Sequence, residues 1–165
     1  MSRPGQLNRA GRVRVACRAR GLRIAPAESC TGGLIAGCLT AIAGSSDVFE
    51  RGFVTYTNEA KAQMLDVPSK LFEEFGAVSD PVARAMAEGA LANSDTQLAV
   101  SVTGVAGPGG GTLEKPVGLV HFALARKGGA TIMEHRVFDG DRTDVRIQTV
   151  TTALNLLKMM AEEAS

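Results

Sequence analysis

The run Ala-Pro-Ala-Glu-Ser-Cys-Thr-Gly-Gly at residues 25–33 constrains the fold more than any other stretch of this chain. An apolar run over residues 22–27 indicates a strand, and an apolar run that starts at Leu34 indicates a helix. A strand end, a tight turn and a helix N-terminus therefore meet here within about nine residues. Such a junction is expected where strands and helices alternate along the chain.

Ser29 lies at this junction, followed by Cys30, Thr31, Gly32 and Gly33. Glycines let the backbone turn sharply and approach a ligand closely. The first N–H groups of a helix point outward as unpaired donors, which favour an anion or a developing oxyanion. Two interpretations stay open: Ser29 is a nucleophile beside an oxyanion site, or Ser29 or Thr31 only caps the helix.

Cys30 is a second candidate nucleophile, although the sequence offers it no identifiable base. The three cysteines are odd in number and form no CxxC pair, so we expect neither a disulfide framework nor a zinc site. Cys17 and Cys38 are predicted to be small core residues on helices. His121 and His135 fall in predicted strands without a metal-ligand companion at useful spacing. We therefore expect partly exposed histidines and no bound metal.

The hydrophobic pattern and the turn residues predict helices and strands in alternation, followed by a hairpin around Lys127-Gly128-Gly129. The expected helices cover residues 6–20, 33–43, 59–65 with Asn58 as N-cap, 68–75, 79–91 and 142–161. The expected strands cover residues 22–27, 49–57, 98–105, 117–125 and 130–138.

This order predicts an α/β fold, a three-layer α/β/α sandwich whose mixed sheet has a parallel core and an antiparallel hairpin. The continuous apolar run at 98–105 is typical of a strand covered on both faces. We expect one domain over residues 1–165. Ligands gather at the carboxyl ends of strands in such sheets, and polar or glycine-rich segments follow three of them, at 28–33, 56–61 and 103–111.

The glycine-rich loop at residues 104–111 suggests a phosphate site but matches no nucleotide-binding motif. It lacks the Lys-Ser or Lys-Thr that completes a P-loop, and Gly104 and Gly107 lack the GxGxxG spacing. Its backbone donors could still hold one phosphate or carboxamide. The loop could equally be a plain connection between two strands.

Lys61 is the candidate base for Ser29. In the first turn of its helix it meets the positive end of the helix dipole, and partial burial would also lower its pKa. A neutral lysine can act as base to a serine. The alternative is a lysine that is solvated or paired with Glu59 or Asp66. Tyr56, the only tyrosine, either packs at the strand end or relays a proton.

Charge and hydropathy exclude several classes of partner. Eighteen basic and 17 acidic residues give a net charge of +1, which does not favour nucleic acid. The locally basic N-terminal segment could touch a phosphate or form a solvated helix face. No apolar run reaches the length of about 18 residues expected of a membrane span, so we expect a cytoplasmic protein. The apolar helix at 33–43 and the open hairpin edge are compatible with a homodimer.

Seven segments of the sequence resemble the motifs of the CinA C-terminal domain family, in the same order. The resemblance spans about residues 10–157. The segments are AESCTGG at 27–33, GSS at 44–46, FERGFVTYTNEAK at 49–61, GAVS at 76–79, GVAGPGG at 104–110, KPVG at 115–118 and FDGDR at 138–142.

The resemblance implies a stand-alone nicotinamide-nucleotide amidohydrolase. Such an enzyme converts nicotinamide mononucleotide to nicotinate mononucleotide and ammonia, a step of pyridine-nucleotide recycling, without a cofactor. By resemblance Ser29 is the nucleophile, Lys61 the base, and Tyr56 a further catalytic residue. The implied oxyanion and substrate-binding residues are Cys30, Thr31, Gly32, Gly33, Thr103, Gly104, Gly107, Gly109 and Arg142.

Two other functions remain as alternatives. The domain could be a non-catalytic module that binds a pyridine nucleotide or regulates another protein. A structural role in DNA uptake or the damage response receives little support, because the chain is nearly neutral and lacks the basic and aromatic stripe of single-strand binders.

Overall fold

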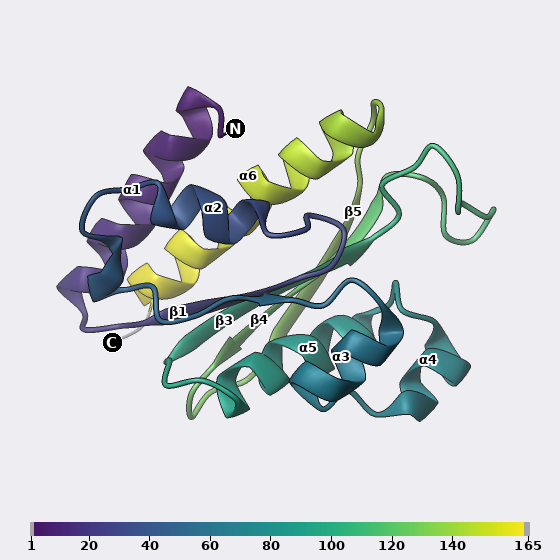
Figure 1. Cartoon of the computed structure of the whole chain (residues 1–165), viewed down its shortest axis with the longest axis horizontal. Helices are drawn as coiled ribbons and strands as arrows, with labels where there is room; N and C mark the ends of the chain where they lie inside the picture. The colour runs from purple at the N-terminus through teal and green to yellow at the C-terminus, as the bar shows by residue number, and fades with distance from the viewer. Residues whose placement is uncertain (1, 164–165) are drawn as a thin grey trace.

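The buried strand β3 (Leu98–Gly104) lies at the centre of a five-stranded sheet with the order β2-β1-β3-β4-β5 (Figure 1). The structure is a computed structural model that describes residues 2–163. Strands β1 (Ile24–Glu28), β2 (Phe53–Val54) and β3 run parallel. Strands β4 (Leu119–Arg126) and β5 (Ile132–Val137) pair antiparallel, and β4 is antiparallel to β3. The predicted mixed sheet is confirmed.

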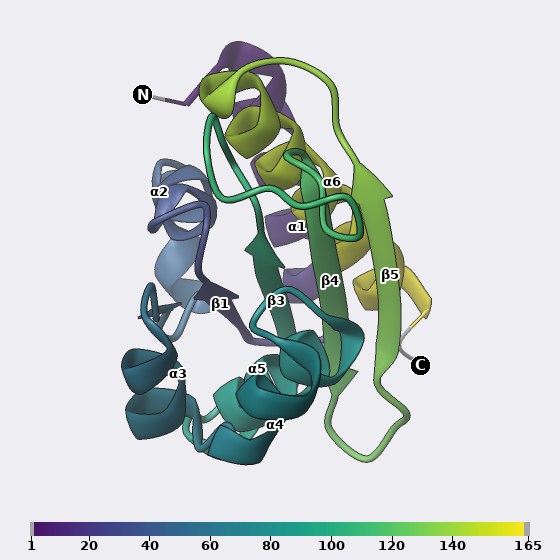
Figure 2. The same cartoon turned by 90° about the vertical axis from the view of Figure 1, so that its right-hand side faces the viewer.

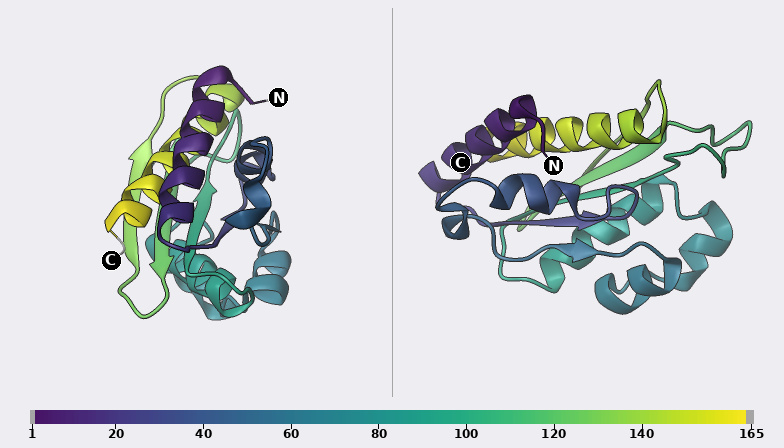
Figure 3. Two further views of the ribbon diagram at one scale, coloured as in Figure 1. Left: turned by 90° about the vertical axis from the view of Figure 1, so that its left-hand side faces the viewer. Right: turned by 45° about the horizontal axis from the view of Figure 1, so that its top comes forward.

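Helices cover both faces of the sheet (Figures 1 and 3). One layer holds α1 (Pro4–Ala19), α2 (Leu34–Thr40), a short 3-10 turn η1 (Ser45–Asp47) and α6 (Arg142–Glu163). The other holds α3 (Asn58–Leu65), α4 (Ser69–Phe75) and α5 (Asp80–Ala92). The three-layer α/β/α prediction is therefore confirmed. Within residues 2–163 no helix combines the length and the apolar character needed to cross a membrane.

The two faces of the sheet bury different side chains. Val102 and its neighbour Phe122 belong to the core under α1 and α6, whereas Ala99 and Ala125 pack under α5. The Ser101 hydroxyl also faces α5 and donates a 2.6 Å hydrogen bond to the Ala83 carbonyl. Small residues on this face let α5 lie close to the strands, while large residues fill the opposite layer.

The predicted strand at 49–57 is much shorter in the structure, where β2 has two residues and Phe49 forms only an isolated bridge to Ile24. The cause lies in β1. The Ile24 N–H donates to the Val48 carbonyl and the Glu28 carbonyl accepts from the Thr55 N–H, so even-numbered residues of β1 face this edge. Pro26, between them, has no N–H to donate. The ladder is therefore interrupted at Pro26.

The helix predicted at 33–43 is also shorter in the structure, and although its sequence is apolar nearly all round, it is not buried on every side. Helix α2 ends at Thr40, and only one face, formed by Ile35, Cys38 and Leu39, is buried. Gly33 precedes it with a φ of 102°, a left-handed conformation that L side chains rarely adopt. A helix lying on one layer of a sandwich needs one apolar face, and the other face of α2 meets solvent.

The N-cap of α3 is Thr57 rather than the predicted Asn58. The Thr57 hydroxyl accepts a 3.0 Å hydrogen bond from the Ala60 N–H, and the Thr57 carbonyl accepts from the Lys61 N–H. Threonine and asparagine are both favoured as N-cap residues, so the sequence alone does not show which of the two adjacent residues caps the helix. Lys61 still lies in the first turn of the helix, as expected.

The spacing along the chain gives neither histidine a metal-ligand companion, but the fold brings the two histidines and one carboxylate together. The β4–β5 hairpin (Figure 2) pairs His121 directly with His135. Asp80, at the first residue of α5, lies beside them with its Oδ1 2.7 Å from His121 Nδ1. Spacing along the chain could not reveal this cluster, because its members come from one helix and two strands.

Candidate active site

The segments that follow β1, β2 and β3 converge at the carboxyl ends of these strands, where they enclose a pocket of about 300 Å³. Nine residues singled out in the sequence line it: Ser29, Cys30, Tyr56, Lys61, Thr103, Gly104, Gly107, Gly109 and Arg142. Six further residues that were not singled out for the site also line the pocket: Asn58, Ala77, Val78, Val105, Ala106 and Gly110.

Ser29 and Lys61 are in direct contact at the bottom of this pocket. Lys61 Nζ donates hydrogen bonds to Ser29 Oγ at 3.0 Å and to the Tyr56 carbonyl at 3.1 Å. The Ser29 hydroxyl lies 3.4 Å from the same carbonyl, to which it donates. Only 1% of Lys61 and 8% of Ser29 is exposed. Lys61 is therefore not the solvated surface lysine of the alternative interpretation.

Burial lowers the pKa of Lys61 below its usual value, because desolvation disfavours the charged ammonium. Attraction to the Glu59 carboxylate acts in the opposite direction and is weaker. No carboxylate within residues 2–163 forms an ion pair with Lys61. A lysine with a lowered pKa and a serine hydroxyl in contact is the arrangement that a general base requires.

Cys30 is poorly suited to act as the nucleophile. Its side chain is buried, and desolvation raises the pKa of the thiol to about 12. The thiolate is the reactive form of cysteine, so the thiol stays protonated and unreactive near neutral pH. Ser29, which has the base that Cys30 lacks, is the stronger candidate.

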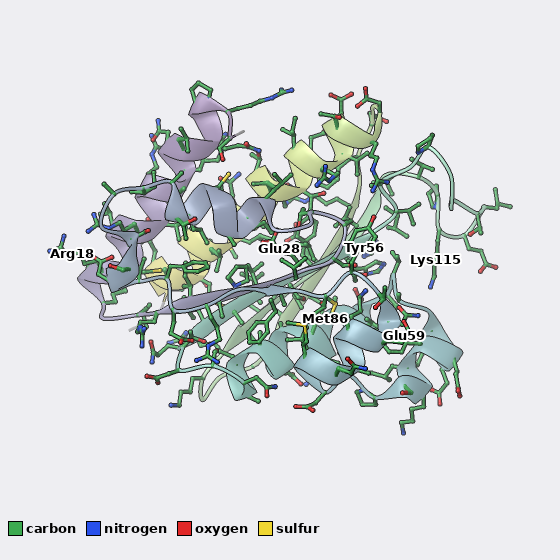
Figure 4. The ribbon with its side chains drawn as sticks, viewed as in Figure 1. Arg18, Glu28, Tyr56, Glu59, Met86 and Lys115 are labelled. Atoms are coloured by element: carbon green, nitrogen blue, oxygen red, sulfur yellow. The ribbon has the colours of Figure 1, made fainter. Side chains whose placement is uncertain are left out.

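The carboxylate of Glu28 occupies the N-terminus of α2, between the helix and the sheet (Figure 4). Completely buried, it accepts hydrogen bonds from the Thr31 hydroxyl at 2.6 Å and from the Ile35 and Ala36 N–H groups at 2.9 Å each. The negative charge also suits the positive end of the helix dipole. These α2 donors therefore hold Glu28 and are not free for an oxyanion.

The structure keeps three of the expected substrate-binding residues, Thr31, Gly32 and Gly33, out of the pocket lining. The Thr31 side chain is buried against Glu28, and the Gly32 N–H donates to the Ser29 carbonyl at 3.0 Å. The N–H groups of Cys30 and Thr31 make no backbone hydrogen bond within residues 2–163. Of these two residues, which follow Ser29 directly, only Cys30 lines the pocket.

Arg146, on α6, fixes the turn that carries these N–H groups. Its Nε donates to the Cys30 carbonyl at 3.0 Å and its Nη2 to the Thr31 carbonyl at 3.1 Å. With both carbonyls held by the guanidinium, the orientation of the intervening peptide is set. The sequence gives no sign of this role for Arg146, because no local motif connects the residue with a turn 116 residues away.

Arg142, the first residue of α6, joins two of the loops. Its Nη1 donates to the Gly107 carbonyl at 2.7 Å, and its Nη2 donates to the Tyr56 hydroxyl at 2.9 Å. Gly107 has a φ of 83°, and a Cβ there would lie 2.5 Å from a Val117 methyl group, so the loop requires glycine at this position. Thr103, 1% exposed, donates its hydroxyl to the Ala77 carbonyl at 2.9 Å.

Replacing Glu28 by Gln is expected to lower the free energy of unfolding by about 1–3 kcal/mol. The amide keeps the shape of the side chain but loses the charge and turns an NH₂ group toward N–H donors of α2. Urea denaturation measures the change. Glu74→Gln, on the exposed surface of α4, is the matched control, with an expected change within about 0.5 kcal/mol. Equal stabilities of the two variants would contradict the role of Glu28.

Residues 7–161 match the family model of the CinA C-terminal domain. A CinA-like protein of Geobacter sp. (strain M21) is 56% identical over 147 residues, which are 89% of this chain and 35% of that protein. The chain thus spans about a third of the length of such relatives. The nicotinamide-nucleotide amidohydrolase PncC of Escherichia coli (strain K12) is 53% identical over 142 residues, 86% of each chain. This chain is its homologue at nearly full length.

Solved structures share the same fold. The competence/damage inducible protein CihA from Agrobacterium tumefaciens superimposes with a TM-score of 0.94 at 50% sequence identity, covering 97% of this chain and 98% of that one. The competence damage-inducible protein A from Klebsiella pneumoniae gives a TM-score of 0.93 at 34% identity, with 97% and 99% coverage.

Proposed function

Because this chain belongs to the CinA C-terminal domain family, we propose that it hydrolyses the carboxamide of nicotinamide mononucleotide to nicotinate mononucleotide and ammonia. The similarity to the Escherichia coli amidohydrolase over 86% of each chain supports the substrate class. The observation that carries the proposal is the 3.0 Å contact between buried Lys61 Nζ and Ser29 Oγ in the pocket.

In the proposed reaction, neutral Lys61 takes the proton of the Ser29 hydroxyl as Oγ attacks the carboxamide carbon. Lys61 then gives this proton to the departing nitrogen, so that ammonia leaves and an ester links the nicotinate acyl group to Ser29. Lys61 then takes a proton from a water molecule that attacks the ester, and it returns this proton to Ser29 Oγ as the ester bond breaks and nicotinate leaves. Serine and lysine can carry acyl transfer without the histidine of the familiar triad, and no step uses a metal or an organic cofactor.

The backbone N–H group of Cys30, which lines the pocket directly after the nucleophile, is the proposed oxyanion donor. Arg146 holds the Cys30 and Thr31 carbonyls and so fixes this turn. Fixed donors of this type contribute about 3 kcal/mol each, because they need no reorganisation when charge develops. This assignment replaces the Gly32 donor, whose N–H is bonded to the Ser29 carbonyl.

Arg142 and the backbone of residues 107–111 are the proposed site for the 5′-phosphate. The Arg142 guanidinium reaches the pocket and donates to neutral acceptors, the Gly107 carbonyl and the Tyr56 hydroxyl. A phosphate is a stronger acceptor for a guanidinium than either, and it can be bound in bidentate fashion. The Tyr56 hydroxyl, released from Arg142, can then donate to the substrate.

The test is ammonia release from nicotinamide mononucleotide compared with free nicotinamide, after treatment with a chelator. We expect release from the mononucleotide that the chelator does not change, and at least about a hundredfold lower kcat/KM for nicotinamide, which lacks the phosphate. Arg142→Met should lower kcat/KM for the mononucleotide and leave that for nicotinamide nearly unchanged. Equal turnover of both substrates would refute the phosphate site. Tight binding of the mononucleotide without ammonia release would instead identify a binding module.

A further inference from the structure

We propose that Asp80, His121 and His135 form a binding site for a divalent transition-metal ion, separate from the Ser29–Lys61 pocket. One ligand atom from each side chain lies within 4.8 Å of the others. None of the three residues lines the pocket or takes part in the proposed hydrolysis. The proposal therefore does not depend on the proposed function.

The two histidines are positioned by the hairpin. His121 on β4 and His135 on β5 are direct cross-strand partners, so their side chains point to the same face of the sheet. Their ring centroids are 5.2 Å apart and the ring planes are inclined by 32°. Two imidazoles this close can present nitrogen atoms to a single ion, and the rigid strands restrict how far they can separate.

Asp80 supplies the third ligand from a different element. It is the first residue of α5, and its Oδ1 lies 2.7 Å from His121 Nδ1. The carboxylate brings a negative charge that offsets the charge of a cation next to the positive end of the α5 dipole. The metal would thus link the start of α5 to the hairpin.

The donor set has the chemistry that zinc and related ions prefer. Two imidazole nitrogens and a carboxylate oxygen are borderline ligands that suit Zn²⁺, Co²⁺, Ni²⁺ or Cu²⁺. Around tetrahedral zinc, ligand atoms lie about 3.4 Å apart, so on binding the 2.7 Å contact between Asp80 Oδ1 and His121 Nδ1 must lengthen and the wider separations, up to 4.8 Å, must shorten. His135 is exposed and the Asp80 side chain is 49% exposed, so both can rotate toward an ion, and water can complete its coordination.

The location connects this site with the pocket wall. Ala77 and Val78, which line the pocket, precede Asp80 by three and two residues. Thr103 is the register partner of His121 on β3, and its hydroxyl binds the Ala77 carbonyl. An ion held by Asp80 and both histidines would therefore fix the segment that forms this wall, without contacting the reacting atoms.

The experiment is calorimetric titration of the chelator-stripped protein with ZnCl₂, with Co²⁺ absorption spectra as a second readout. We expect one site with a dissociation constant in the micromolar range, weakened at least about tenfold in His135→Ala and in Asp80→Asn. At a hundredfold excess over the dissociation constant, zinc should raise the melting temperature of the wild type by about 5 °C or more. Co²⁺ should give visible ligand-field bands that His135→Ala lacks.

Glu134→Gln is the matched control. Glu134 is the neighbour of His135 on β5 but pairs with Phe122, so its side chain points to the opposite face of the sheet. The substitution removes one negative charge near the site but changes none of the three proposed ligands, so the zinc affinity should be retained. A thermal melt of apo His135→Ala that matches the apo wild type shows that the variant is folded. Equal zinc affinities of wild type and His135→Ala, or no saturable binding by the wild type, would overturn the proposal.

Discussion

Replacement of Ser29 by Ala is expected to reduce kcat/KM for ammonia release from nicotinamide mononucleotide by at least about 10⁴-fold. The variant loses the only group that can form the proposed ester, while Lys61 and the backbone donor at Cys30 remain. Ser29 is 8% exposed, and removing its hydroxyl leaves the fold and the pocket in place, so the mononucleotide should still bind. Ammonia detection measures the loss of hydrolysis, and calorimetric titration of the same preparation measures whether the mononucleotide still binds.

Cys30→Ala provides the matched control at the adjacent position. Burial raises the pKa of this thiol to about 12, and the proposed oxyanion donor is the Cys30 main chain, which alanine retains. We therefore expect a loss of no more than about tenfold, from altered packing alone. The opposite pattern, in which Cys30→Ala is inactive and Ser29→Ala is active, would identify the cysteine as the nucleophile.

Replacement of Lys61 by Met is expected to lower kcat/KM by about 10²- to 10⁴-fold, the usual contribution of a positioned general base. The sign of the pH dependence follows from the protonation state, since only neutral Lys61 can accept the Ser29 proton. Burial lowers the pKa of Lys61, so wild-type kcat/KM should rise with pH through that lowered value. The residual activity of Lys61→Met should lack this rise, which steady-state kinetics from pH 6 to 10 would reveal.

The same substitution is expected to leave the protein at least as stable as the wild type at pH 7. In the unfolded chain Lys61 has its ordinary pKa, so between the lowered folded pKa and the ordinary one the unfolded state binds more protons. The free energy of unfolding of the wild type therefore rises with pH across this window, and the cost of the buried charge is fully present below it. Methionine removes that cost. Urea denaturation at pH 7 and pH 10 measures the stability of Lys61→Met relative to the wild type and the rise of the wild-type stability with pH.

Two outcomes would contradict the role of Lys61. Unchanged activity of Lys61→Met near neutral pH would exclude the residue as the base. A large loss of stability at pH 7, together with lost activity, would show that its ammonium is structural. Glu59→Gln is the matched control, since Glu59 acts on Lys61 only through weak attraction. It should change kcat/KM by less than about threefold.

The order and type of the main helices and strands could be predicted from the sequence, because the residues that specify each element lie within that element or next to it. The apolar run of β3, the turn before α2 and the Ser79 cap of α5 each specify an element within a few residues. The contact between Ser29 and Lys61 was anticipated because both follow parallel strands, whose carboxyl ends meet at one edge of the sheet. The family motifs identified the residues, and the topology explains why they converge.

The interactions that the sequence did not reveal are side-chain contacts across long separations. Nothing in the sequence distinguishes the carboxylate that caps α2, Glu28, from an ordinary strand-end glutamate, and Arg146 is one of many arginines. The interruption at Pro26 depends on which neighbour each residue of β1 faces, which becomes known only with the strand order. The histidine pair likewise depends on the register of β4 and β5.

Helix α6, the last element of the chain, holds both the glycine loop and the turn after Ser29 through Arg142 and Arg146. During synthesis the proposed nucleophile leaves the ribosome long before this helix, because the turn and Arg146 are 116 residues apart. A nascent chain that has formed β1 and α3 already contains Ser29 and Lys61 but lacks the two arginines. We therefore expect the proposed hydrolysis to begin only after α6 has been synthesised, and truncated products that lack α6 to be inactive.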